Sequence, residues 1–120
     1  MTQIRGAINH RAGHMAEACV AAHCLRQGYE LLAERWRGSG GEIDLIARDG
    51  AEVVFIEVKK SRSFSQAAAR ISARQIARLQ AAASEYMALL PEGQNTPVRF
   101  DVALVDGMGR IEIIRNALGP

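Results

Sequence analysis

The residues best suited to chemistry lie in two runs of alternating sequence, residues 42–48 and residues 51–59. Asp49 and Gly50 separate the runs, and an Asp-Gly pair between β-branched residues favours a hairpin with a two-residue turn. Side chains alternate between the two faces of a strand. We therefore expect one face of the hairpin to carry Glu42, Asp44, Glu57 and Lys59 together.

With Asp49 and Gly50 as the turn, the register places Asp44 opposite Phe55 and diagonal to Glu57. Clustered carboxylates repel unless a cation or a shared proton lies between them, and hard oxygen ligands suit Mg²⁺ or Mn²⁺. A lysine beside such an ion suits the hydrolysis of phosphodiester bonds. The alternative is an ordinary solvated sheet face. In the same register Glu42 lies opposite Glu57.

The formal net charge of +2 conceals a strong asymmetry along the chain. Residues 41–59 hold five acidic and two basic side chains, whereas residues 60–80 hold five basic and no acidic ones. Such a basic segment after an acidic one predicts contacts with a phosphate backbone, the alternative being a solvated helix face. The basic residues are Lys60, Arg62, Arg70, Arg74 and Arg78.

The elements around the hairpin follow from periodicity and capping signals. The sequence predicts helices over residues 12–27 and 72–90 and strands over residues 29–36, 98–105 and 110–115. Gly28 is expected to end the first helix and Ser72 to cap the second. The resulting order is αβββαβ plus a short last strand. At 120 residues we expect one α/β domain over residues 12–120, with residues 1–11 as a flexible arm.

Composition argues against several classes of protein. No apolar stretch is long enough to cross a membrane, and the first residues lack the apolar core of a secretion signal. Two cysteines five residues apart, Cys19 and Cys24, are expected to be reduced thiols. These features predict a cytoplasmic protein.

The motifs together resemble a known family. Gly41-Glu42-Ile43-Asp44 followed by Glu57-Val58-Lys59 is similar to the PD-(D/E)xK nuclease superfamily. Within it, the chain resembles the YraN-like family of small bacterial nuclease-like proteins, which are similar to archaeal Holliday-junction resolvases. The resemblance runs from Gly13 to Leu118. It implies a restriction-endonuclease-like αβββαβ core, with a mixed central sheet flanked by helices.

The resemblance also implies roles for individual residues. Asp44 and Glu57 would hold Mg²⁺ or Mn²⁺, Glu17 would join them from the first helix, and Glu42 is a secondary ligand candidate. Lys59 would activate or position the attacking water and stabilise charge on the phosphate. The substrate implied is DNA, including branched DNA, and two symmetric cuts would make a homodimer the simplest assembly.

Two departures from the family pattern bear on DNA contacts. Gln75 stands where family members often carry a lysine, and Ser61 stands where they often carry an arginine. Gln75 nevertheless joins the basic residues as a candidate DNA contact. The departures leave open a nucleic-acid-binding module without catalysis, and a protein-interaction scaffold is a third reading.

Several other residues favour structural readings over functional ones. The pairs His10/His14 and Cys19/His23 have helical metal-ligand spacing, but each is only a pair. Trp36 and Tyr29 could stack on bases, although core packing is the preferred interpretation. We expect Asp101 to form an ion pair with an arginine.

Overall fold

The computed structural model describes the backbone of residues 2–60 and 72–117, and side chains from residue 14 onward within those ranges. The described elements are two α-helices, one 3-10 turn and five strands. In chain order they are α1 (Thr2–Arg26), β1 (Glu30–Arg37), β2 (Glu42–Asp49), β3 (Glu52–Lys60), α3 (Ala73–Met87), η1 (Gly93–Asn95), β4 (Val98–Val105) and β5 (Ile111–Ile114).

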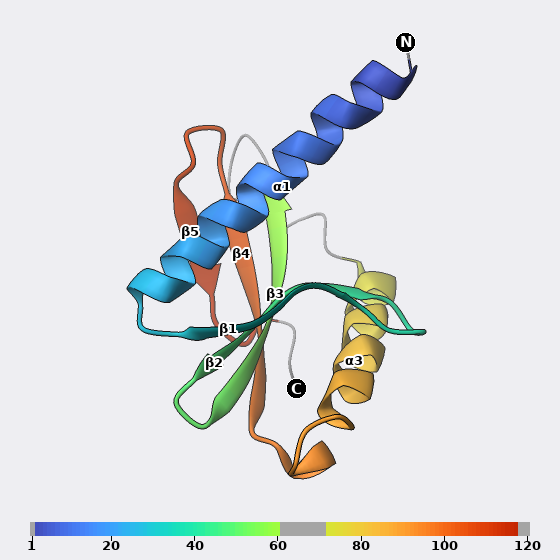
Figure 1. The fold of residues 1–120 in the computed structure, drawn as a ribbon, viewed down its shortest axis with the longest axis vertical. Coiled ribbons are helices and arrows are strands. Elements are labelled where there is room, and N and C mark those ends of the chain that lie inside the picture. Colours follow the sequence, from blue (N-terminus) through green and yellow to red (C-terminus); the bar gives the residue numbers. More distant parts are fainter. Residues whose placement is uncertain (1, 61–71, 118–120) are drawn as a thin grey trace.

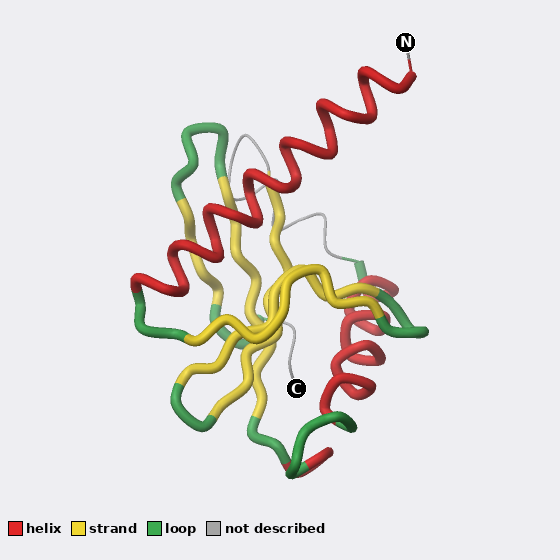
Figure 2. Tube along the Cα trace, in the orientation of Figure 1, coloured by secondary structure: helices red, strands yellow, loops and turns green. Residues whose placement is uncertain are grey.

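The described strands form one mixed sheet in the order β1-β2-β3-β4-β5. β3 and β4 are parallel, and every other neighbouring pair is antiparallel. The crossover from β3 to β4 passes through α3, as a parallel pair requires. Figures 1 and 2 show α1 lying across the sheet and α3 standing beside it. The predicted fold class is confirmed, and the arrangement is compatible with an αβββαβ core.

Each face of the sheet has its own apolar core, and we call these faces the α1 side and the α3 side. On the α1 side, Val20 and Cys24 pack against strand residues that include Val54 and Ile56. On the α3 side, Leu79 packs against strand residues that include Phe55. The predicted apolar face of β3 is therefore the α1 side. β3 is an internal strand, as expected, because it pairs with β2 and β4.

The helix ends obey the capping signals. Gly28 has φ of +85°, its N–H donates to Leu25 O, and the N–H of Tyr29 donates to Cys24 O at 2.9 Å. These two bonds form a Schellman motif, so the predicted C-terminal glycine is confirmed. Ser72 caps α3 through the N–H of Gln75, and the Gln75 side chain accepts from the N–H of Ser72. This is the reciprocal capping box.

The start of α1 differs from the prediction. The stretch expected to be an arm is helical from Thr2, not from residue 12. Its first turns lack an apolar period, but each residue added to an existing helix gains a backbone hydrogen bond without a new nucleation cost. In Figure 1 this half of α1 runs past the edge of the sheet.

The hairpin register was predicted wrongly by two residues. The structure pairs Asp49 with Glu52 and Ile46 with Phe55, so the turn residues are Gly50 and Ala51. Gly50 has φ of +63°, and a positive φ at only the first turn residue is the pattern of a type II′ turn. The prediction had placed the glycine second in the turn. Continuing the observed register brings Asp44 opposite Glu57 itself.

Candidate functional site

The acidic residues of the hairpin lie where the sheet divides. β2 pairs with β1 as far as Glu42, but its ladder with β3 stops at Leu45. β3 continues to Lys60 in pairing with β4 alone. The two middle strands therefore separate over residues 42–44 and 57–60, and we call this opening the fork. Figure 1 shows β1 and β2 turning towards α3 while β3 runs upward.

The alternation of side chains breaks at the fork in both strands of the β1–β2 pair. In β2, Ile43 and Ile46 both pack on the α3 side although they are three residues apart. In β1, Ala33 and Trp36 do the same. Strict alternation forbids this spacing, so each strand carries an irregularity between them. The prediction that one hairpin face carries all four charged residues assumed regular alternation in both strands. β2 does not alternate regularly between Ile43 and Ile46, so that assumption fails for this strand.

Asp44 occupies the gap that the diverging strands leave. Its Oδ2 accepts a hydrogen bond of 2.8 Å from the backbone N–H of Val58, so a side chain replaces the missing ladder bond. Burial, and next the charge of Glu57, raise the pKa of Asp44 to about 7. Glu17 acts in the same direction, whereas the Val58 bond and Lys59 oppose the rise. Asp44 therefore carries a proton for part of the time near neutral pH.

Glu17 of α1 lies close enough to the fork for its charge to act on Asp44. Its Oε2 accepts a 2.8 Å hydrogen bond from Nε of Arg35, and only 15% of its side chain is exposed. Arg35 lies in β1 with φ of +51°, a strained conformation for a residue with a side chain. Hydrogen bonding to Glu17 and the nearby charges of Glu42 and Asp44 raise the pKa of Arg35. Arg35 was not among the residues predicted from the sequence, because no local pattern links it to a carboxylate on α1.

Glu57 and Lys59 lie together on β3, and alternation places both on the α3 side. Nζ of Lys59 is 3.1 Å from Oε1 of Glu57, and each side chain is less than one-fifth exposed. Glu42 stands apart from this pair. It forms an ion pair of 3.0 Å with Arg37, its partner in the β1–β2 ladder. The carboxylates that the structure brings to the fork are Asp44, Glu57 and Glu17.

Two ion pairs and a proton on Asp44 offset the negative charge of the fork. Within residues 14–60 and 72–117, no three His, Cys, Asp or Glu side chains are gathered closely enough to hold a metal ion as they stand. Glu17 is engaged by Arg35 and Glu57 by Lys59. A divalent cation would therefore replace cations already present and the proton on Asp44. The donor set itself, carboxylate oxygens at one opening, suits Mg²⁺ or Mn²⁺.

The predicted phosphate contacts are only partly placed. Arg62 and Arg70 lie outside the described residues. Arg74 and Arg78 are exposed on α3, four residues apart and so on one face. Lys60 is exposed at the end of β3. Gln75 is engaged in the capping box of α3, which is a structural role.

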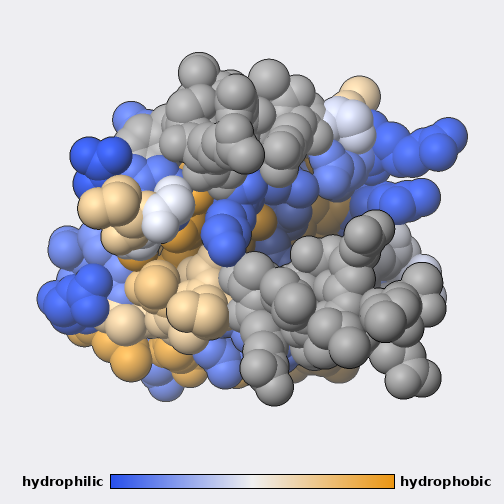
Figure 3. All heavy atoms as spheres, turned by 90° about the horizontal axis from the view of Figure 1, so that it is seen from above, coloured by the Kyte–Doolittle hydropathy of each residue, from blue (hydrophilic) through white to orange (hydrophobic). Residues whose placement is uncertain are grey.

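Figure 3 looks down on the end of the molecule towards which β3 runs. Between the two grey regions the visible surface is mostly hydrophilic, with smaller apolar patches. Lys59 and Lys60 end β3 on this side.

A buried ion-pair network lies at the opposite end of the hairpin. Nε of Arg99 is 3.1 Å from Oδ2 of Asp101, and NH1 of Arg99 contacts Asp49 and Glu52 at 3.0 and 2.9 Å. NH2 of Arg99 donates to the hydroxyl of Tyr29. The predicted ion pair of Asp101 is confirmed. The network joins β4 to the hairpin turn and to the start of β1.

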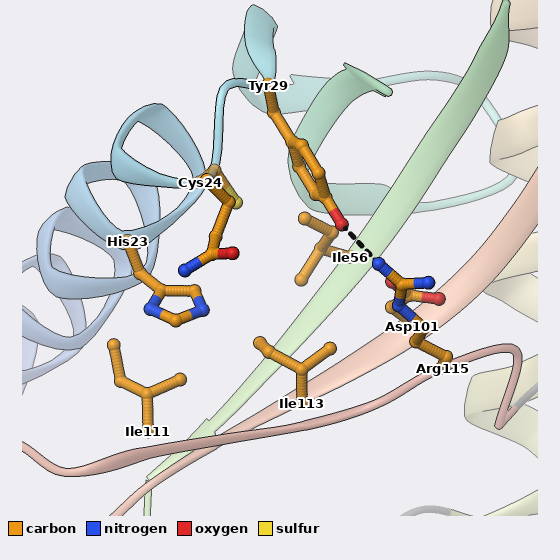
Figure 4. A pocket seen from close by; sticks show the side chains of 9 residues that line it. His23, Cys24, Tyr29, Ile56, Asp101, Ile111, Ile113 and Arg115 are labelled. Carbon is orange, nitrogen blue, oxygen red and sulfur yellow. Dashed lines mark hydrogen bonds between the residues drawn. The ribbon is translucent and has the colours of Figure 1, made fainter. Parts of the chain in front are cut away.

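The core packing of Trp36 and a cavity under α1 are two further features of the structure. Trp36 packs edge-to-face on Tyr86 with ring centroids 5.4 Å apart, which confirms its predicted packing role. A cavity of about 340 Å³ lies under the end of α1, over Ile113 and beside Tyr29, whose hydroxyl accepts from Arg115 (Figure 4). The residues that line this cavity do not include the carboxylates of the fork. No helix in the described part of the chain is long and apolar enough to cross a membrane.

Comparison with known proteins identifies the family of the chain. Residues 16–105 match the family described as "Uncharacterised protein family UPF0102". A UPF0102 protein of Ruegeria pomeroyi is 60% identical over 115 residues, covering 96% of this chain and 94% of the relative. One of Cereibacter sphaeroides is 63% identical over 112 residues, covering 93% and 96%. One of Dinoroseobacter shibae is 42% identical over 114 residues, covering 95% and 85%. The chain therefore belongs to the UPF0102 family, the YraN-like family that its motifs resemble.

Proposed function

We propose that this protein is a metal-dependent endonuclease that hydrolyses phosphodiester bonds of DNA, including branched DNA. One observation carries the proposal: Asp44, Glu57, Lys59 and Glu17 meet at the fork. They come from three different elements, and Asp44 is held in the gap by the N–H of Val58. Four ionisable groups collected from distant parts of the chain, one of them with a pKa near 7, are typical of a reaction centre.

Each residue has a role that its chemistry suits. Asp44 and Glu57 would hold Mg²⁺ or Mn²⁺, and Glu17 would join them after leaving Arg35. A bound metal supplies a water of lowered pKa and neutralises charge on the phosphate. Lys59 lies beside Glu57, so its ammonium group can orient the attacking water and stabilise charge that develops on the phosphate oxygens. Arg35 would be a positioning residue for Glu17.

The DNA would lie over the end of the molecule that carries the fork. Arg74 and Arg78 are exposed on α3, and the backbone of Arg78 lies against the turn between β1 and β2. Contacts to phosphate position a duplex without reading its sequence. Selectivity for branched DNA would come from DNA shape and from a two-fold dimer.

One observation favours a second candidate, a nucleic-acid-binding module without catalysis. In this structure the fork carboxylates are paired with Arg35 and Lys59, and no described set of ligands is ready for a metal. A protein that kept these pairs permanently would bind DNA but would not cut it. The two candidates differ in whether divalent metal changes the outcome.

Labelled four-way, flap and linear DNA, incubated with Mg²⁺ or Mn²⁺, separate these candidates. Wild-type protein should cut at least one branched DNA, and Asp44→Ala and Lys59→Ala should lose cleavage while still binding DNA. Glu112→Gln is the matched control, because Glu112 is exposed on β5, the edge strand remote from β2. Salt-sensitive binding without cleavage at any metal concentration would establish the binding module instead. The absence of both would overturn the proposal.

A further inference from the structure

The turn between β1 and β2 is packed closely on α3. The N–H of Gly38 donates to Gly41 O at 2.9 Å and closes the turn. A Cβ atom added at Gly40 would be 2.8 Å from Cβ of Ala81, and one at Gly41 would be 3.2 Å from the carbonyl oxygen of Arg78. Both distances are shorter than ordinary contact, so glycine is needed for this close approach. The backbone of the turn therefore lies directly on the helix, as Figure 2 shows.

Glu85 of α3 grips the same turn. One carboxylate oxygen accepts from the N–H of Ser39 at 3.0 Å and from the Ser39 hydroxyl, and the other accepts from the N–H of Gly40 at 2.9 Å. These bonds lower the pKa of Glu85, so the carboxylate is ionised at neutral pH. A carboxylate on two successive backbone N–H groups binds more strongly than a neutral acceptor would. Glu85 is thus a clamp between α3 and the turn.

The clamped turn is three residues from Asp44. Between them, Ile43 is fully buried in the core of the α3 side. The turn and Ile43 together hold the end of β2 against α3. Figure 1 shows β2 turning towards α3, and its ladder with β3 stops at Leu45. The end of β2 is therefore held to a helix beside the point where β2 and β3 separate.

We propose that Glu85 is a positioning residue that sets the width of the fork by anchoring the β1–β2 turn to α3. Without the anchor, the end of β2 is free to move towards or away from β3, and the bond between Asp44 and the N–H of Val58 is weakened. The consequence for metal binding and cleavage rests on the proposed function. The consequence for the Val58 bond does not, because that bond joins two groups of the chain itself.

Amide hydrogen exchange of the metal-free protein measures how well the hydrogen bond from Val58 to Asp44 protects the Val58 amide. Glu85→Gln should speed exchange at Ser39 and Gly40 and also at Val58, by about tenfold or more, because a hydrogen bond to a charged acceptor is being lost at the turn. Amides in the middle of β3, such as Ile56, should be unchanged. Glu92→Gln is the matched control, since Glu92 is exposed and makes no side-chain cap at η1. Exchange at Val58 equal to wild type in Glu85→Gln would overturn the proposal.

Two compensating substitutions, at Gly40 and Ala81, test whether the close contact between the turn and α3 protects the Val58 amide. Gly40→Ala places its methyl group against Ala81 and should speed exchange at Val58 as Glu85→Gln does. Adding Ala81→Gly removes the opposing methyl group, so the double variant should regain at least part of the lost protection. Equal exchange at Val58 in the single and double variants would contradict the anchor.

Metal affinity and DNA cleavage separate this proposal from the proposed function. If the wild type cuts DNA, Glu85→Gln should weaken Mn²⁺ binding and lower the cleavage rate, and Glu92→Gln should change neither. If the wild type neither binds metal nor cuts DNA, the proposed function fails. A selective change at Val58 would then still establish the anchor. Normal metal affinity together with unchanged exchange at Val58 in Glu85→Gln would leave the site standing and remove Glu85 from it.

Discussion

Replacing Asp44 by asparagine should stabilise the protein relative to wild type, and this gain in the free energy of unfolding should be larger at pH 8 than at pH 5. In the folded protein the pKa of Asp44 is about 7, against an ordinary value of 3.8. The folded state therefore holds a proton that the unfolded chain releases between about pH 4 and pH 7. Under this condition the free energy of unfolding falls as pH rises, and the loss is complete above pH 7.

The pKa values also give the size of the effect. The difference of about three pH units corresponds to a loss of about 4 kcal/mol at pH 8, at 1.36 kcal/mol for each unit. About two of those units lie between pH 5 and pH 7, so wild type should lose about 3 kcal/mol over that interval from Asp44 alone. Asparagine cannot ionise, and its carbonyl oxygen can still accept from the N–H of Val58. The stability advantage of Asp44→Asn should therefore grow by about 3 kcal/mol between pH 5 and pH 8.

Urea unfolding at pH 5 and pH 8, with EDTA present, measures this quantity. Comparing variant with wild type at each pH cancels the titration of groups that do not interact with Asp44, provided that the denaturant slopes agree. Glu112→Gln should show no such growth. A difference between Asp44→Asn and wild type that is the same at both pH values, within about 0.5 kcal/mol, would refute the assignment of a buried, partly protonated Asp44.

Three further predictions concern other parts of the molecule. Mn²⁺ affinity, measured by calorimetry, should rise by up to about tenfold per pH unit between pH 5.5 and pH 7, because the ion displaces the proton of Asp44. An affinity that does not change with pH would contradict this prediction. Arg99→Met should lower the free energy of unfolding by about 3–5 kcal/mol, because Asp101 is 1% exposed and loses its cation. Arg37→Met breaks an ion pair whose side chains are 79% and 37% exposed and should cost less than about 1 kcal/mol; similar losses in urea would count against the buried network. Arg74→Ala and Arg78→Ala should each reduce the slope of log affinity for DNA against log salt by about 1, and unchanged slopes would remove α3 from the DNA surface.

Much of the fold could be predicted because its signals are local. β4 occupies residues 98–105 as predicted, since a run of β-branched and apolar residues follows Pro97 directly. Gly28 and Ser72 end and begin their helices as expected, because capping depends on the residue type at one position. The predicted faces of β3 survived a register error, since a shift of two residues leaves each β3 side chain on its predicted face.

The details of the site could not be predicted because they arise from contacts between distant elements. The turn next to Asp44 is held by hydrogen bonds to Glu85 of α3, more than 40 residues further along the chain. The pair between Glu17 and Arg35 joins a helix to a strand through a residue with positive φ, and nothing in the local sequence marks it. The residue types were visible in the sequence, whereas the opening that collects them depends on tertiary packing.

Single-turnover cleavage of a labelled four-way junction with Mn²⁺ tests the claim that the fork cuts DNA. Wild type and Lys59→Met should be compared with protein in excess over DNA. We predict that wild type cuts the junction and that Lys59→Met binds it but cuts about 100-fold more slowly or less, because an ammonium group beside the reacting phosphate is lost. Cleavage by Lys59→Met at the wild-type rate, or no cleavage by wild type with either Mn²⁺ or Mg²⁺, would contradict the claim.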